Sequence, residues 1–68
     1  MSVICLVTVI VQLGNVYFSG TERMEGRVLA VGKEDYMVDF SMHARHNNYV
    51  GDYSKVLVSK QKCAEALK

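Results

Sequence analysis

The chain has 68 residues, of which half are hydrophobic and 22% are charged, and its formal net charge is +1. This length leaves room for one domain, and this hydrophobic content excludes an intrinsically disordered chain. Cys5 and Cys63 are too few and too far apart for a secreted disulfide framework. We therefore expect both to be buried thiols of a cytoplasmic protein.

The first element predicted is a strand over residues 3–12, which opens with the apolar run VICLVTVIV. The run is about half as long as the roughly 20 residues that a membrane helix needs, and its β-branched residues favour a strand. We therefore expect no membrane association. Because both faces of this strand are apolar, either it bends to serve both halves of a small barrel or something covers its outer face. A helix at the C-terminal end, or a homodimer formed through residues 3–12, would provide that cover.

Turn residues follow, because Gly14 and Asn15 both tolerate positive φ. Residues 16–18 pair back briefly in this interpretation, and residues 19–23 form a polar loop. Strands are then predicted at 26–31 and 36–42, joined by a tight turn at 32–35. The second of these strands alternates cleanly between apolar and polar positions, so this hairpin is the clearest structural signal in the sequence.

Residues 43–52 show neither helical nor strand periodicity, so they are predicted to be mostly loop, with a short strand around 48–50. A last strand covers 55–59. Ser59 is then a suitable N-cap for a helix over residues 60–67. The apolar face of this helix would consist of Cys63, Ala66 and Leu67. The predicted core comprises Val7, Val9, Val28, Ala30, Val38, Phe40, Val56 and Val58.

Two segments carry a resemblance to a known fold: GRVLAVGKEDYMVDF, and YVGDYSKVLV after it. Together they resemble the central hairpin and closing strand of SH3-like small β-barrels of the Tudor and KOW kind, over about residues 24–58. The fold expected for residues 1–68 is therefore one all-β domain. It is an SH3-like barrel of four to five strands with a short C-terminal helix, and barrel closure would remove exposed sheet edges.

Charge is distributed unevenly, with three basic and five acidic residues in 1–40 but five basic and two acidic residues in 41–68. This asymmetry points to an anionic partner for the second half. The candidate binding residues are His43, Arg45, His46, Asn47, Asn48, Tyr49, Tyr53 and Lys55. The cations would neutralise phosphates and the tyrosines would stack on bases, so RNA or single-stranded DNA is one expected partner. The KOW resemblance implies RNA binding as well.

The rival hypothesis is a module that binds a larger protein or complex and regulates or inhibits it. The Tudor resemblance implies an aromatic cage for a methylated side chain, held by cation–π attraction. The aromatic residues available for such a cage are Tyr17, Phe18, Tyr36, Tyr49 and Tyr53. The partly unpaired first strand would also serve for self-association or β-augmentation.

Catalysis and metal binding have little support in the sequence. His43 and His46 stand three residues apart, but zinc needs three or four protein ligands and the other donors lie at no recognised spacing. Neither cysteine lies in a setting that favours a thiolate nucleophile. Glu34 and Asp35 are adjacent in a turn, where acids are usually solvated. We therefore expect a non-enzymatic binding protein without a metal or cofactor.

Overall fold

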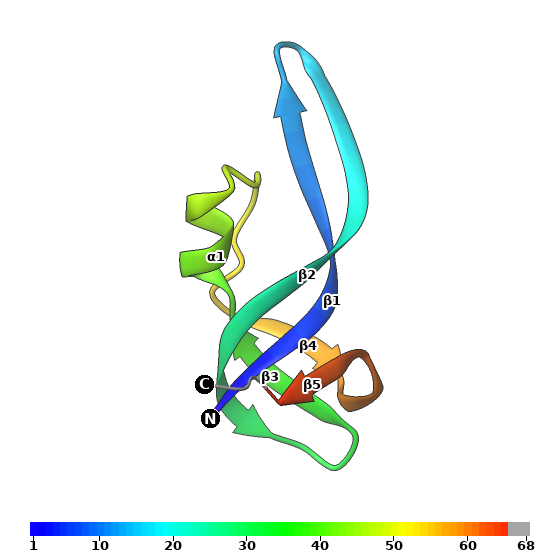
Figure 1. The fold of residues 1–68 in the computed structure, drawn as a ribbon, viewed down its shortest axis with the longest axis vertical. Helices are drawn as coiled ribbons and strands as arrows, with labels where there is room; N and C mark the ends of the chain where they lie inside the picture. The colour runs from blue at the N-terminus through cyan, green and yellow to red at the C-terminus, as the bar shows by residue number, and fades with distance from the viewer. Residues whose placement is uncertain (66–68) are drawn as a thin grey trace.

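The computed structural model describes residues 1–65, which form a five-stranded antiparallel sheet and one short helix (Figure 1). The strand order across the sheet is β4-β3-β2-β1-β5. The elements in chain order are β1 (Ser2–Leu13), β2 (Val16–Val31), β3 (Asp35–Asp39), α1 (Ser41–His46), β4 (Val56–Ser59), the 3-10 turn η1 (Lys60–Lys62) and β5 (Cys63–Glu65). The fold is therefore mainly β, as predicted.

The sheet is strongly curled although its edges do not pair. β4 and β5 occupy opposite edges, yet only η1 separates them in the chain. Adjacent strands lie about 4.8 Å apart, so the edges of a flat five-stranded sheet would be about 19 Å apart. The four residue steps from Ser59 to Cys63 span at most about 14 Å when fully extended. The two edges must therefore bend toward each other.

The β1–β2 hairpin is longer than the sequence suggested. It pairs without interruption from Ser2 opposite Arg27 to Leu13 opposite Val16. Gly14, with φ of +61°, is the first residue of the two-residue turn, a position where a type II′ turn requires positive φ. The prediction of a polar loop at 19–23 is wrong, because β1 supplies a pairing partner for every residue there.

Beyond Val9, the hairpin projects from the rest of the molecule as an arm, which we define as residues 10–19 (Figure 1). No side chain of residues 10–23 is buried. The molecule is correspondingly elongated, with extents of 39 × 23 × 16 Å. Arm residues thus contribute little to the core that stabilises the fold.

The core lies against the inner face of β1, which Val3, Cys5, Val7 and Val9 provide. Of the eight predicted core residues, five are buried, namely Val7, Val9, Val38, Phe40 and Val58, while Val28 and Val56 are partly buried. Ala30 is exposed, so that prediction is wrong. The reason is a β-bulge between Val28 and Ala30, which inserts one residue and reverses the alternation of faces.

Two turns of the same sequence form hold the core aromatics. Asp39 precedes Phe40 and Ser41, and the same pattern recurs at residues 52–54 with Tyr53 in the middle. Each aspartate Oδ1 accepts hydrogen bonds from the backbone N–H and the hydroxyl of the serine two residues later. The Phe40 N–H donates to the Tyr53 carbonyl at 2.8 Å, so the two turns are joined back to back.

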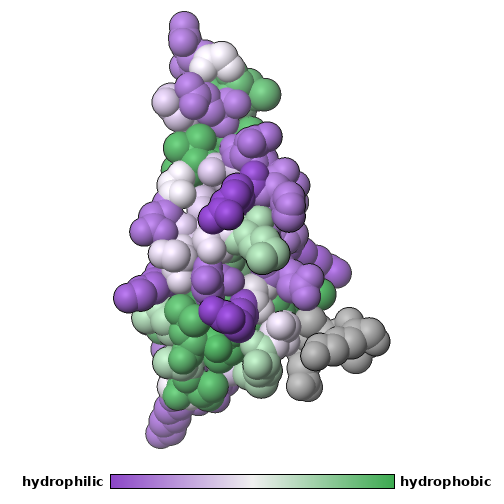
Figure 2. Space-filling model, turned by 90° about the vertical axis from the view of Figure 1, so that its left-hand side faces the viewer, coloured by the Kyte–Doolittle hydropathy of each residue, from purple (hydrophilic) through white to green (hydrophobic). Residues whose placement is uncertain are grey.

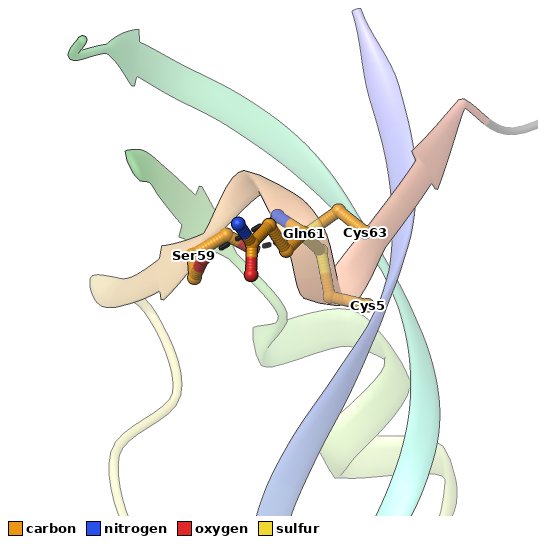
Figure 3. Close-up of a disulfide and its surroundings, with 4 residues drawn as sticks. All are labelled: Cys5, Ser59, Gln61 and Cys63. Carbon is orange, nitrogen blue, oxygen red and sulfur yellow. Dashed lines mark hydrogen bonds between the residues drawn. A yellow bond between two sulfur atoms is a disulfide. The ribbon is translucent and has the colours of Figure 1, made fainter. Parts of the chain in front are cut away.

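A disulfide joins Cys5 of β1 to Cys63 at the start of β5 (Figure 3). The expectation of two free thiols is therefore wrong. Although 58 residues separate the two cysteines in sequence, β5 pairs antiparallel with β1 and places them directly opposite each other. The spacing concealed this bond because it depends on which strands are neighbours.

The predicted C-terminal helix is also wrong over the residues that the structure describes. Ser59 does act as a cap, since its hydroxyl accepts the Gln61 N–H at 3.3 Å. The coil it caps is only the single turn η1, after which the backbone extends to pair with β1. Helix propensity is a weak preference that sheet pairing overrides. Ala66 and Leu67 of the predicted helix lie outside the described residues.

Phe40→Ala should lower the free energy of unfolding by about 3–5 kcal/mol, because Phe40 is fully buried. Met42→Ala is the matched control, since Met42 is 71% exposed, and should change stability by less than about 0.5 kcal/mol. Urea unfolding followed by circular dichroism measures both. Equal losses for the two variants would show that Phe40 is not a core residue.

Reduction of the disulfide should lower the free energy of unfolding by about 2–4 kcal/mol, because the bond closes a loop of nearly the whole chain. Urea unfolding with and without a phosphine reductant tests this. The double variant Cys5→Ala/Cys63→Ala is the control and should be insensitive to the reductant. An unreduced chain no more stable than the reduced one would contradict the prediction.

Candidate binding site

The segment from His43 to Tyr49 holds most of the predicted site and is the end of a helix, not a loop. Ser41–His46 form α1, and the N–H groups of Asn48 and Tyr49 donate back to the carbonyls of Arg45 and Ala44. This double reversal is a Schellman motif, which requires a left-handed residue at its centre. Asn48 occupies that position with φ of 58°.

Asn47 and Asn48 therefore both stabilise this turn. Asn48 supplies the positive φ, which asparagine adopts more readily than most residues. The Asn47 side-chain amide donates to the His43 carbonyl at 2.9 Å. Two asparagines after a short basic segment were the sequence signal for this helix end, and the prediction of a loop missed it.

The two tyrosines of the predicted site differ in exposure. Tyr53 is 9% exposed, and its hydroxyl donates to the Val50 carbonyl at 2.8 Å and accepts the Ile10 N–H at 3.2 Å. Its ring and hydroxyl attach the connection after α1 to the base of the arm. Tyr49 is half-buried and lies roughly parallel to the His43 ring, with centroids 6.4 Å apart. Tyr49 thus stays partly accessible.

The two histidines line one hollow of about 430 Å³ between α1 and β2. His43 Nδ1 accepts the Glu25 N–H at 3.3 Å, so this imidazole also closes the edge of β2. Arg27 and Asp39 line the same hollow. Within residues 1–65, no three histidine, cysteine or acidic side chains are grouped as metal ligands.

The remaining predicted residues are at the surface. Arg45 and His46 are exposed on α1, and Lys55 is exposed just before β4. The structure therefore places His43 beside Tyr49 and in one hollow with His46, and it buries Tyr53. Any contact of these exposed cations with a ligand stays a prediction.

The five aromatic residues expected for a cage lie in three places. Tyr17 and Phe18 are at the tip of the arm, and Tyr49 and Tyr53 lie beside its base, with ring centroids 6.4 Å apart in an edge-on arrangement. Tyr36 belongs to β3, where the Lys60 ammonium lies 5.4 Å from its ring centroid. The tip aromatics are thus separate from the others.

One group of exposed hydrophobic side chains is at that tip. Leu13, Val16, Tyr17 and Phe18 are 63%, 53%, 59% and 53% exposed. Figure 2 shows hydrophobic surface near the upper end of the molecule and a broader hydrophobic area in its lower half. On the outer face of β1, Ile4, Leu6 and Ile10 are also exposed, at 38–43%, and this is the face on which Tyr17 lies. The sequence showed that both faces of β1 are apolar. It did not show that residues 16–18, which pair back with β1, form an exposed surface.

Comparison with protein families, curated proteins and solved structures found no match. In residues 1–65, no helix has the length and apolar character needed to cross a membrane.

The two Asp-aromatic-Ser turns should make stability depend on pH. The serine hydroxyl and then the serine N–H hold the pKa of Asp39 and of Asp52 below the ordinary value of 3.8. Because the folded pKa is the lower one, this stabilisation is present above about pH 4 and is lost as pH falls through the folded pKa.

The variant Ser41→Ala/Ser54→Ala should therefore be less stable than the wild type at about pH 7, and the difference should shrink by about pH 2. Urea unfolding at both pH values measures the difference. The control is Ser19→Ala, since Ser19 lies in the arm. A wild-type advantage that stays constant with pH would contradict the assigned hydrogen bonds.

Proposed function

We propose that this chain is a small non-enzymatic binding module that contacts another protein through its projecting arm. The single observation that carries the proposal is the exposed apolar tip formed by Leu13, Val16, Tyr17 and Phe18. An aromatic side chain carries about 150–250 Å² of surface, so the four side chains, which are 53–63% exposed, leave about 400 Å² accessible in total. Because paired residues share a face, Leu13, Val16 and Phe18 lie on one face of the hairpin and Tyr17 lies on the other. Exposed apolar side chains gathered at one end of a molecule often mark a contact surface.

The arm favours a protein partner over a nucleic acid because it has no charge. Residues 8–21, TVIVQLGNVYFSGT, contain no lysine, arginine, aspartate or glutamate. Nucleic-acid binding draws much of its affinity from cations that neutralise phosphates. Regulation or inhibition of a larger complex is the role that such a compact module would serve.

RNA or single-stranded DNA remains the alternative partner, bound at the exposed residues of α1 and the connection after it. Arg45, His46 and Lys55 support it, since all three are exposed. The burial of Tyr53 weakens it, because a stacking platform must present its ring to the base.

We also propose that the fold is related to SH3-like barrels. The curl of the sheet supports it, because η1 brings β4 and β5 close at opposite edges, as a barrel requires. The cytoplasmic location stays a prediction, and the Cys5–Cys63 bond weighs against it because stable disulfides belong mainly to oxidising compartments.

A photo-crosslinking benzophenone side chain introduced in place of Tyr17 tests the proposal in living cells. We expect a protein adduct, and adding Val16→Ser/Phe18→Ser to the same chain should reduce its yield by about tenfold, as loss of an interface hot spot would. The same probe at Leu57 is the control, since Leu57 is 64% exposed but lies on β4. Its adducts should not respond to the tip changes.

Two results would overturn this function. One is the absence of a tip-dependent protein adduct at residue 17. The other is nucleic acid that co-purifies with the wild type, measured by absorbance at about 260 nm against 280 nm, and is lost in Arg45→Glu/Lys55→Glu.

A further inference from the structure

Among residues 1–65, one side of β2 has no backbone partner along the arm. From Val16 to Met24, β2 pairs only with β1, and its pairing with β3 starts at Arg27. Between them, the Glu25 N–H is occupied by His43 Nδ1. The unpaired stretch therefore has a defined end at α1 and extends to the tip. A row of unpaired N–H and C=O groups is a template for another strand.

The other edges in residues 1–65 are shorter or occupied. β4 and β5 are only four and three residues long. The outer edge of β1 is occupied by β5 over Val3–Cys5, and higher up the Val50 N–H donates to the Ile10 carbonyl at 2.7 Å. Val11 makes a further bridge to Tyr49. The 16–24 edge is therefore the most available site for strand pairing.

We propose that the 16–24 edge of β2 pairs antiparallel with the same edge of a second copy of this chain, so that the two arms form one four-stranded ribbon. The inference rests on the proposed protein-binding function of the arm and names its partner. An isolated two-stranded ribbon is only marginally stable in water, whereas three or more strands support one another. Pairing with a copy supplies those strands.

Symmetry restricts the register of such a pair. A two-fold axis perpendicular to the ribbon keeps outer face with outer face, so the axis must pass through a residue, which then faces itself. With the axis at Ser19, Phe18 lies opposite Gly20 of the second copy, and Tyr17 lies opposite Thr21. Both are favourable cross-strand pairs, since an aromatic ring covers the bare glycine backbone.

This register also avoids α1. Val16 of each copy would reach Glu22 of the other, so the pairing ends before Met24 and the His43 contact at Glu25. The charged Glu22 and Arg23 then lie at the ends of the ribbon, where water still reaches them. Because each copy offers one such edge, pairing closes at a dimer and does not continue into a fibre.

The dimer should be weak. Among the tip residues, β2 brings only Val16, Tyr17 and Phe18 to the contact, and a part of their surface becomes buried, which is below the size of a standard stable interface. We therefore expect sedimentation velocity of the purified wild type to show a monomer–dimer equilibrium in the micromolar range. Phe18→Asp should raise the dissociation constant by about tenfold, and Leu57→Asp, on β4, should leave it unchanged.

Single cysteines test the register on the oxidised chain, whose own cysteines are bonded to each other. In a glutathione buffer, Ser19→Cys should form the covalent dimer severalfold faster than Thr21→Cys or Thr8→Cys. Thr8 is exposed and pairs with Thr21 one strand further from the contact. A mixture of Tyr17→Cys and Thr21→Cys chains should also crosslink faster than either alone.

Equal crosslinking rates at residues 8, 19 and 21 would overturn the proposed pairing, as would a wild type that is monomeric at all concentrations up to about 1 mM. These failures are distinct from failure of the proposed function. A monomeric chain whose residue 17 still crosslinks to a different protein would disprove the dimer and leave the binding module intact. Adducts of twice the chain mass at residue 17 would support both.

Discussion

Three residues of coil between β4 and β5 are the constraint on which this fold depends. Because η1 is too short to cross a flat sheet, the sheet must curl until its two edge strands, β4 and β5, approach each other. The concave side so formed is where Phe40, Met24 and the inner face of β1 are buried. Gly26 lets the side chains of Val38 and Phe40 pack directly against the β2 backbone, since a Cβ there would lie 2.5 Å from Val38 Cγ1 and 2.6 Å from Phe40 Cδ1.

The curled sheet covers only part of the β1–β2 hairpin. Only the lower half of β1 and β2 lies over the concave core, and the connection at 47–53 covers the hairpin as far as Val11 through Tyr49 and Tyr53. The upper half has no such cover among the described residues. Binding surface and folding core are thus divided along the same two strands, and substitutions at the tip have little effect on the core.

Local patterns in the sequence predicted what neighbouring residues decide. The strand at 3–12, the turn at Gly14 and the hairpin around 32–35 are confirmed, because alternation and turn chemistry act over a few residues. What failed depends on residues distant in sequence. The bond between Cys5 and Cys63, the strand conformation of 19–23 and the pairing of β1 with β5 all require knowledge of which strands are neighbours.

Two residues of the candidate site have structural roles that the sequence analysis did not predict. Asn48 and Tyr53 were assigned to ligand binding because their side chains are suited to it. In the structure, Asn48 provides the positive φ that ends α1, and the Tyr53 hydroxyl donates a hydrogen bond to the Val50 carbonyl. An asparagine at a position of positive φ and a tyrosine between an aspartate and a serine are structural signals. The exposed residues Arg45 and Lys55 carried no such conflict, so their placement at the surface could be predicted from charge alone.

The pairing of β5 with β1 also governs the order of events during synthesis. β1 leaves the ribosome before β5, because Cys63, which completes the edge of β1, is translated 58 residues after Cys5. Throughout that interval, β1 and β2 can form a hairpin by local contacts, but the curled sheet cannot close. Productive folding is therefore delayed until translation has passed Cys63, and a growing chain exposes both the tip and the β1 edge to whatever is nearby.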